Sequence, residues 1–273
     1  MNALTHDASA LLNRSLTSSD VAEAHRWQAY RTYFGLSDEE YAGAIHWLLF
    51  TSLPQASRAD GHAAIMPPFP QLALPRRMWA GGEVKWIEPI AEGDSLTRTS
   101  KIIRADSKTG STGDLLITSL HHQISRGPDV CIDERQDVIF MPAATAPASP
   151  RPRLLDYTPD WQRDTLFDEV ALFRYSALTF NSHRIHYDAI YAREVEHYPA
   201  LVVHGPLLAS TLIQTALREL GAARPVAFSY RAVAPAFVGE KLQIVGKGDA
   251  NALQLAVVGA DGSVRTAGTL QAA

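Results

Sequence analysis

The segment 204–220 restricts the fold most, because it reads as a helix whose apolar face is too wide for a surface position. Pro206 suits the first helical turn, where its missing N–H is not needed, and Gly221 suits the position after the last turn. Two apolar rows run along the segment, formed by Leu208, Leu212 and Ala216 and by Ile213, Leu217 and Leu220. We therefore expect a buried helix with other elements wrapped around it.

A short repeat indicates that the chain contains two related halves. Residues 89–96 read PIAEGDSL and residues 235–242 read PAFVGEKL, so both follow the pattern P-x-x-x-G-[D/E]-x-L at an offset of 146 residues. Strand-like segments flank each copy, as expected for a turn that a proline begins and a glycine tightens. The offset is about half of the 273 residues, which suggests a duplicated unit.

Strand-like segments occur in both halves, at 83–87, 96–104, 115–120 and 137–140 and at 227–233, 242–246, 253–258 and 264–270. The polar stretch 108–113 and the Asp261-Gly262 pair predict hairpin turns. A first-half helix is expected over 41–50, preceded by amphipathic helical stretches at 20–27 and 30–33. Each half thus reads as a long helix wrapped by an antiparallel sheet, which is the α+β hot-dog arrangement, and the chain as a double hot-dog.

The proline-rich stretch 142–160 separates the two halves and resembles an extended linker, since it holds five of the 16 prolines. We predict a first half over 1–145 without an active site, a linker over 146–160, and a catalytic half over 161–273. One active site per chain follows, because residues 40–60 show no cluster of histidine and asparagine like that of the second half.

Composition excludes several classes of protein. Lys and Arg number 25 against 29 Asp and Glu, a net charge of −4 that argues against nucleic-acid binding. The single cysteine, Cys131, excludes an internal disulfide and favours a cytoplasmic location. We expect its side chain to be buried as a small hydrophobic group. We expect no signal peptide and no membrane association, because the N-terminus lacks a cationic start and no 18-residue apolar run occurs.

Polar side chains concentrate between residues 175 and 206, where four of the ten histidines lie: His183, His186, His197 and His204. A hydrated loop before a helix would explain some of this, but the residue types also suit catalysis. A histidine can act as a general base near neutral pH, and a nearby amide can hold a water molecule. The free N–H groups at the start of the buried helix can polarise a thioester carbonyl. Together they suit the addition of water to an α,β-unsaturated acyl thioester, or its removal.

The segment resembles the hydratase motif of the MaoC-like R-specific enoyl-CoA hydratases. Tyr175, Thr179, Ile185, His186 and Asp188 match the motif, as do the residues Val202-Val203-His204-Gly205. Asn181 stands where the family has its catalytic aspartate, His183 where it has an asparagine, and Phe180 where it has a glycine. The spacing of five residues from Asn181 to His186 is kept.

The form Phe-Asn-Ser-His-Arg-Ile-His-Tyr-Asp is similar to one branch of that family, which contains the type 2 hydroxyacyl-thioester dehydratases and the mesaconyl-CoA and itaconyl-CoA hydratases. The resemblance implies a double hot-dog with a degenerate first half and a cofactor-free hydro-lyase. The implied substrate is an acyl-CoA, such as a short branched dicarboxylic one, with a 3-hydroxyacyl thioester of fatty-acid metabolism as the alternative. A thioesterase or a non-catalytic thioester-binding protein is a weaker alternative.

The resemblance also implies roles for single residues. His186 is the expected acid–base residue, and Asn181 the residue that orients water or substrate, since an amide cannot take the proton. His186 then works alone or shares the proton with another group. The Gly205 N–H is assigned to the oxyanion hole. The remaining candidates support the site or bind substrate: Asp188, His183, Arg184 as a partner for a substrate carboxylate, and His204 by packing.

A metal site is not expected. His183, His186 and Asp188 form a possible ligand set, but the cysteine pairs and His-Glu-x-x-His spacing of zinc sites are missing from the sequence. The Gly246-Lys247-Gly248 stretch lacks the third glycine of a dinucleotide-binding turn. Pairing of two or more chains through sheet edges is expected, so that the protein is a homo-oligomer.

Overall fold

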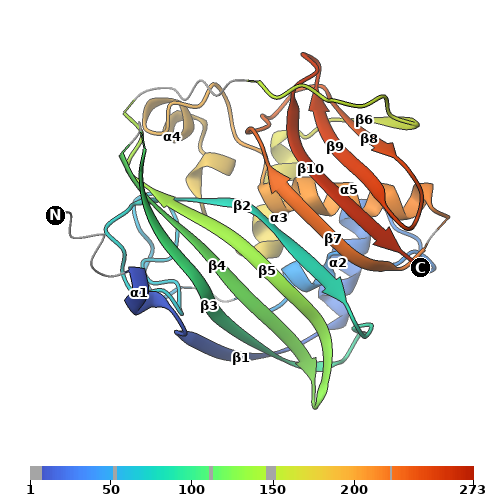
Figure 1. Ribbon diagram of the computed structural model, residues 1–273, viewed down its shortest axis with the longest axis horizontal. Helices are drawn as coiled ribbons and strands as arrows, with labels where there is room; N and C mark the ends of the chain where they lie inside the picture. The colour runs from blue at the N-terminus through green and yellow to red at the C-terminus, as the bar shows by residue number, and fades with distance from the viewer. Residues whose placement is uncertain (1–7, 52–53, 111–112, 146–151, 222) are drawn as a thin grey trace.

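Ten strands form a single antiparallel sheet in the computed structural model, which describes residues 8–51, 54–110, 113–145, 152–221 and 223–273 (Figure 1). The order across the sheet is β1-β3-β4-β5-β2-β7-β10-β9-β8-β6. The first five strands are β1 (Ser15–Val21), β2 (Arg76–Trp86), β3 (Ser95–Gly110), β4 (Gly113–Arg126) and β5 (Asp129–Met141). The others are β6 (Trp161–Thr165), β7 (Pro225–Ala232), β8 (Leu242–Lys247), β9 (Leu253–Gly259) and β10 (Val264–Ala272).

The sheet has the same strand order in both directions from its centre. β2 pairs with β7 there, and from this pair the order is β2-β5-β4-β3-β1 on one side and β7-β10-β9-β8-β6 on the other. The two copies of the repeat join β2 to β3 and β7 to β8, and their glycines, Gly93 and Gly239, have positive φ angles of 87° and 75°. The predicted double hot-dog is confirmed in this arrangement. The domain bounds stay a prediction, because both halves contribute to one sheet.

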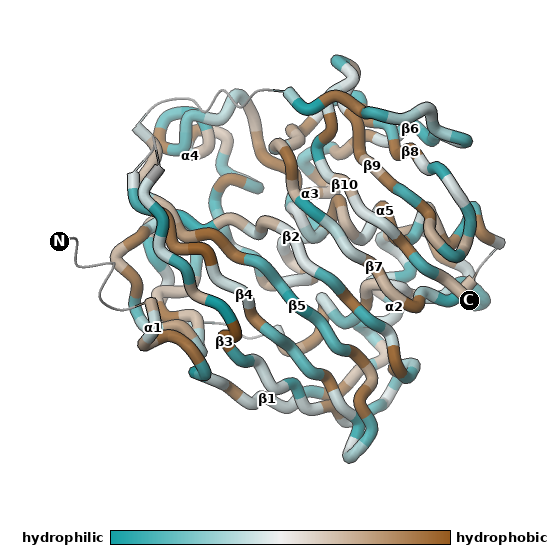
Figure 2. Tube along the Cα trace, in the orientation of Figure 1, coloured by the Kyte–Doolittle hydropathy of each residue, from teal (hydrophilic) through white to brown (hydrophobic). Residues whose placement is uncertain are grey.

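The helix expected over 204–220 is confirmed as α5 (Gly205–Glu219), which contacts β2, β7, β8, β9 and β10. Its fully buried side chains include Leu207, Leu212 and Ile213. Figure 2 shows hydrophobic and hydrophilic residues alternating along the strands, as expected when one face of each strand packs on a core. α5 therefore lies at the centre of the hydrophobic core.

The long helix expected in the first half over 41–50 is replaced by one 3-10 turn, η1 (Ile45–Leu48). Gly43 explains the difference, because it packs so closely on α5 that a Cβ atom there would lie 2.5 Å from Ile213 Cγ2. Its N–H donates to Gln214 Oε1 at 2.6 Å rather than to a carbonyl of a preceding turn. The earlier helix is α2 (Ala24–Phe34), whereas residues 20 and 21 belong to β1.

Four short helical elements were not predicted: α1 (Ala8–Leu11), α3 (Glu169–Thr179), η2 (Arg184–His186) and α4 (Ala189–Glu194). Within the predicted linker, residues 146–151 lie outside the described residues. Leu154 forms an isolated bridge with Ser263, so the described part runs beside the β9–β10 turn. The tip of the first-half turn at 111–112 also lies outside the described residues.

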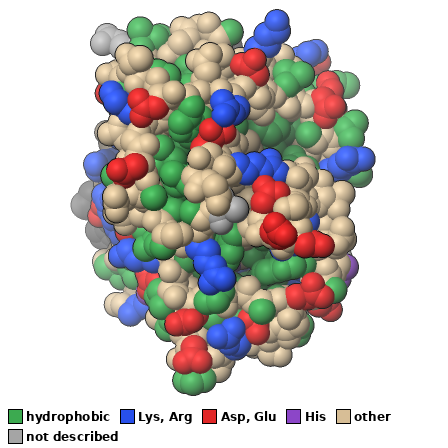
Figure 3. Space-filling view, turned by 90° about the vertical axis from the view of Figure 1, so that its right-hand side faces the viewer, with side chains coloured by type: hydrophobic (Ala, Val, Ile, Leu, Met, Phe, Trp, Pro, Cys, Tyr) green, Lys and Arg blue, Asp and Glu red, His purple; other side chains and the backbone are tan. Residues whose placement is uncertain are grey.

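Among the described residues, no helix is long and apolar enough to cross a membrane. Figure 3 shows basic and acidic side chains interspersed over one face of the molecule, with hydrophobic side chains in the hollows between them. This face therefore carries mixed charge rather than a basic stripe.

Candidate active site

The end of α3 begins the motif. Asp168 caps the helix by accepting a hydrogen bond from the Ala171 N–H at 2.7 Å, and Phe180 ends it in the left-handed conformation, with φ 47°. Asn181 follows directly, and its Oδ1 accepts a hydrogen bond from the His183 N–H at 3.1 Å. The turn therefore fixes the Asn181 carbonyl group and leaves its NH₂ group available to another acceptor.

His186 is held in one orientation inside the protein. Its side chain belongs to η2 and the residue is 7% exposed. Nδ1 donates a hydrogen bond to the Val202 carbonyl oxygen at 2.7 Å. Because a carbonyl can only accept, this bond places the ring proton on Nδ1 and leaves the lone pair on Nε2. His186 is therefore a fixed hydrogen-bond acceptor.

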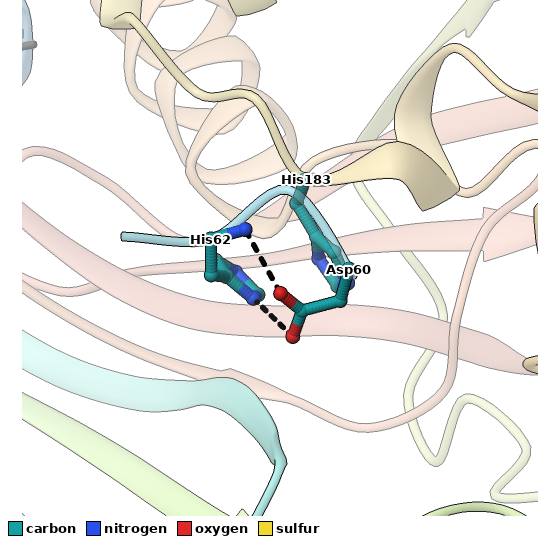
Figure 4. A group of neighbouring side chains, drawn as sticks. All are labelled: Asp60, His62 and His183. Atoms are coloured by element: carbon teal, nitrogen blue, oxygen red, sulfur yellow. Dashed lines mark hydrogen bonds and ion pairs between the residues drawn. The ribbon is translucent and has the colours of Figure 1, made fainter. Parts of the chain in front are cut away.

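His186 belongs to a row of four imidazole rings, formed in order by His204, His186, His183 and His62. The ring centroids of His204 and His186 lie 3.6 Å apart in a stack, those of His186 and His183 5.5 Å apart edge to face, and those of His183 and His62 3.8 Å apart. We call this set the histidine row. Ser176 Oγ bonds His204 at one end at 2.8 Å, and Asp60 bonds His62 at the other (Figure 4).

A loop of the first half supplies that second end. Arg184 donates its backbone N–H to the Asp60 carbonyl at 2.9 Å, and Ser182 Oγ donates to the Gly61 carbonyl at 2.5 Å. Gly61 has a φ of +88°, and a Cβ atom there would lie 1.8 Å from the Ser182 carbonyl oxygen. Only glycine therefore allows this loop to pack so closely against the motif.

Burial keeps the histidine row neutral. It lowers the pKa of His186 to about 4, against the opposing effect of the hydrogen bond to Val202. It lowers the pKa values of His183 and His204 as well, and the neighbouring histidines add to both effects. At neutral pH these rings are therefore uncharged. Each can accept a hydrogen bond or a proton, but none carries the extra proton of an imidazolium.

This burial predicts that the protein loses stability in mild acid. The unfolded chain binds protons at its histidines near pH 6.5, whereas folded His186 binds one only near pH 4, so stability is complete above pH 6.5 and falls below it. We expect His186 alone to remove about 2 kcal/mol from the free energy of unfolding between pH 7 and pH 5. Urea unfolding at both values measures it, and an unchanged midpoint would contradict the burial of these rings.

The first residue of α5 lies beside the row. Gly205 packs under the Trp79 ring so closely that a Cβ atom would lie 2.9 Å from Trp79 Cε3. Pro206 has no N–H, and the Gly205 N–H makes no hydrogen bond within the described ranges. The helix start therefore offers an N–H donor and the positive end of the helix dipole.

These groups face a cavity of about 380 Å³ between the two halves. Four predicted residues line it: Asn181, His183, His186 and Gly205. A second cavity of about 380 Å³ adjoins it and shares His62, Arg77, Trp79, Gln136, Asn181 and Pro206 with it. The space is therefore continued on the far side of Asn181 and Trp79, where Trp47, Leu49 and Phe50 line it together with Arg98.

The other three predicted residues lie outside the cavity lining. His204 lies behind His186, in contact with its ring. Asp188 caps α4 through the Tyr191 N–H at 3.0 Å and pairs with Arg184 at 2.7 Å. Arg184 also donates to the Ala59 carbonyl and lies 4.3 Å from the centre of the Tyr191 ring. Arg184 and Asp188 thus connect the motif to α4 and to the first-half loop.

The sequence analysis named none of Asp60, His62 and Arg77 as a site residue. Arg77 lines both cavities, and within the described part of the chain no carboxylate lies within ion-pair distance of its guanidinium. Its one side-chain hydrogen bond is to Met66 Sδ. Two signals in the sequence pointed to these residues: a carboxylate and an imidazole two residues apart, and an Arg-Arg pair at the start of a strand.

Asp60, His62 and His183 could each offer one atom to a metal ion, with all three atoms within 4.8 Å of one another. The set differs from the His183, His186 and Asp188 set considered from the sequence. The centroids of the His62 and His183 rings lie 3.8 Å apart, and their planes are tilted by 32°. Asp60 accepts a hydrogen bond from His62 Nδ1, so this nitrogen carries a proton rather than a lone pair for a metal ion (Figure 4).

Similarity to known proteins identifies the family of the chain. The family model for hydroxyacyl-thioester dehydratase type 2 matches residues 43–238, which include the first-half loop and the motif. The chain belongs to this family. It is 36% identical over 235 residues to mesaconyl-C(4)-CoA hydratase of Chloroflexus aurantiacus, a match that covers 83% of the chain and 81% of the relative.

Solved structures with the same architecture confirm the fold. A MaoC-like dehydratase from Phytophthora capsici superposes with a TM-score of 0.74 at 15% identity over 96% of each chain. A Mycobacterium tuberculosis protein described as having a double hotdog fold gives a TM-score of 0.61 at 13% identity over 97% of each chain. Family membership makes the protein an acyl-thioester hydro-lyase, as the motif predicted.

Proposed function

We propose that the protein adds water to, or removes it from, an acyl-CoA whose short acyl group carries a second, free carboxylate. Mesaconyl-CoA and itaconyl-CoA have this chemistry. The observation that carries the proposal is the position of Arg77, a charged side chain in the cavity without a carboxylate partner among the described residues. The similarity to a mesaconyl-C(4)-CoA hydratase supports it.

Arg77 suits a substrate carboxylate better than the neighbouring arginines do. Burial lowers its pKa to about 10, with the Asp60 charge partly opposing this, so it stays charged at neutral pH although no carboxylate among the described residues forms an ion pair with it. Arg76, the preceding residue, pairs with Glu196 at 2.7 Å, and Arg184 pairs with Asp188. A guanidinium binds a carboxylate through two parallel hydrogen bonds, which would offset the cost of burying both charges.

The predicted catalytic residues fit this reaction. The thioester carbonyl accepts the Gly205 N–H, where charge develops on the oxygen as an enolate forms. His186 Nε2 accepts one O–H of the water that adds to Cβ, and the Asn181 NH₂ group donates to the substrate. We assign His183 and His204 to packing around His186, and Asp188 and Arg184 to anchoring the segment.

The test compares Arg77→Met with Arg184→Gln on mesaconyl-CoA, itaconyl-CoA and crotonyl-CoA. Loss of a buried ion pair costs roughly 2–4 kcal/mol, so we expect Arg77→Met to lower kcat/KM for the two dicarboxylic substrates about 30- to 1000-fold. Crotonyl-CoA, which has no second carboxylate, should change only a few-fold. The loss of the conjugated thioester absorbance and the product mass measure hydration.

Two results would contradict the proposal: an equal effect of Arg77→Met on all three substrates, or a selective loss in Arg184→Gln instead. A wild-type enzyme that prefers octenoyl-CoA would favour the alternative, a dehydratase of fatty-acid metabolism. The continuation of the cavity along Trp47, Leu49 and Phe50 is the feature that could hold such a chain. Release of free CoA without hydration would indicate a thioesterase.

The proposal includes a cytoplasmic location and a homo-oligomeric state. Cys131 is buried and unpaired, which is consistent with a reducing compartment. The strands at the two ends of the sheet, β1 and β6, each have one edge without a partner strand among the described residues. Such edges can pair with a second chain. Size-exclusion chromatography with light scattering measures the assembly.

A further inference from the structure

The motif has no carboxylate at position 181, where the MaoC-like R-specific enoyl-CoA hydratases that it resembles have an aspartate. Asn181 occupies that position, and an amide can hold a water molecule but cannot take its proton. His186 has a backbone carbonyl as its partner and is stacked on a neutral imidazole. Neither contact would stabilise a positive charge on His186 as a carboxylate would.

The first-half loop brings a carboxylate to the site by another route. Asp60 Oδ2 accepts a hydrogen bond from His62 Nδ1 at 3.1 Å, and Asp60 Oδ1 accepts one from the His62 N–H at 2.9 Å (Figure 4). Both residues are 8% exposed. With its proton on Nδ1, His62 keeps the lone pair on Nε2, and the residue lines both cavities.

Charged and titratable groups surround His62 on several sides. Asp60 and Arg58 belong to its own loop, Arg77 to β2, and His183 to the motif, with His186 beyond it. Burial opposes the charge on Asp60, but the hydrogen bonds from His62 outweigh it and lower the pKa of the carboxyl below its usual range. Asp60 is therefore an anion, and it is the group that would compensate a proton on His62.

We propose that His62, oriented by Asp60, is the group that takes the proton in this reaction, and that His186 holds the reacting water. This inference rests on the proposed hydro-lyase function. In hydration, one O–H of the water breaks and its proton passes to His62 Nε2 while the water oxygen bonds to Cβ. The electron pair of the double bond moves to the thioester oxygen. His62 then returns the proton to Cα, so that one water is added and no other reactant is needed.

This division of roles follows from the partners of the two rings. A proton on His62 forms an ion pair with Asp60, whereas a proton on His186 would have only a carbonyl dipole beside it. A carboxylate that orients a histidine and stabilises its imidazolium is a recurring arrangement in acid–base catalysis. The enzyme thus recovers with Asp60 the negative charge that position 181 lacks.

The experiment compares Asp60→Asn and His62→Gln with the wild type over the pH range, using the preferred substrate. Asparagine can still accept the His62 N–H, so the loop should keep its shape. We expect kcat to fall about 100-fold or more in His62→Gln and about 10- to 100-fold in Asp60→Asn. Burial lowers the pKa of His62 and Asp60 offsets part of that effect, so the loss of Asp60 should lower this pKa further and move the acidic limb of kcat/KM to lower pH.

Asp133→Asn is the matched control. Asp133 pairs with His121 at 2.8 Å on the sheet and lines neither cavity, so its loss should leave the pH profile unchanged. An Asp60→Asn enzyme with the wild-type kcat and the wild-type acidic limb would overturn the inference. A second outcome would also overturn it: a fall in the kcat of Asp60→Asn without a shift of the acidic limb, together with an equal fall in Ser182→Ala. Ser182→Ala removes a hydrogen bond to the loop but keeps Asp60. A wild type that hydrates no substrate would instead overturn the proposed function.

Discussion

His186→Gln is expected to lower kcat about 10²- to 10⁴-fold on every acyl-CoA that the enzyme hydrates. The wild-type ring is locked by the Val202 carbonyl with its Nε2 lone pair free, so a reacting water meets an acceptor in a fixed place. Glutamine can still donate to Val202, but it cannot place an imidazole lone pair at the same point. The effect should fall on kcat more than on KM, because the interaction is with water rather than with the acyl group.

Loss of conjugated thioester absorbance, with product mass as a second readout, measures this effect. His121→Gln is the control, because His121 lies on the sheet outside the site. Thermal unfolding separates chemistry from packing, since removing the stack on His204 can also destabilise the core. A folded His186→Gln enzyme with kcat within threefold of the wild type would remove His186 from the mechanism.

The sequence predicted the elements whose signals are local. The apolar rows of α5, its proline start and the following glycine gave the helix within one residue at each end. The repeated turn gave the two-halved sheet, because its proline and positive-φ glycine recur at the same place in each half. The prediction of a long first-half helix was wrong because of a tertiary contact: the close packing of Gly43 on α5 overrides the local preference for a helix.

The structure brings four of the predicted site residues together, and their catalytic roles stay a prediction. Spacing within the motif placed Asn181, His183, His186 and Gly205 around one cavity. His62, which Asp60 holds by a hydrogen bond, reaches the same cavity from a loop that is 121 residues away in sequence from its contact at Ser182. No periodicity links such distant segments. Arg184 already pairs with Asp188 four residues later, so its predicted role as a partner for a substrate carboxylate stays a prediction, and the structure offers Arg77 for that role instead.

Gly205→Ala is expected to lower kcat/KM about 100-fold or more, because it disturbs the oxyanion donor without removing it. Alanine suits a helix start, so the backbone itself tolerates the change. The obstacle is the Trp79 ring, 2.9 Å from the new Cβ. Trp79 stacks on Tyr230 at 4.4 Å and meets Trp47 edge to face at 5.6 Å, so its movement away from the helix is restricted. The start of α5 must shift instead, and the Gly205 N–H shifts with it.

The double variant Gly205→Ala/Trp79→Phe tests that cause. A smaller ring gives the methyl group space, so the double variant should recover at least tenfold of the activity that Gly205→Ala loses. Overpacking should also cost Gly205→Ala about 1–3 kcal/mol of stability, which the second change should partly restore. Purely additive effects in kcat/KM and in the free energy of unfolding would show that the ring contact is not the cause. Recovery in both quantities would tie the position of the Gly205 N–H to the packing of Trp79, and so a residue of the first half to the oxyanion donor of the second.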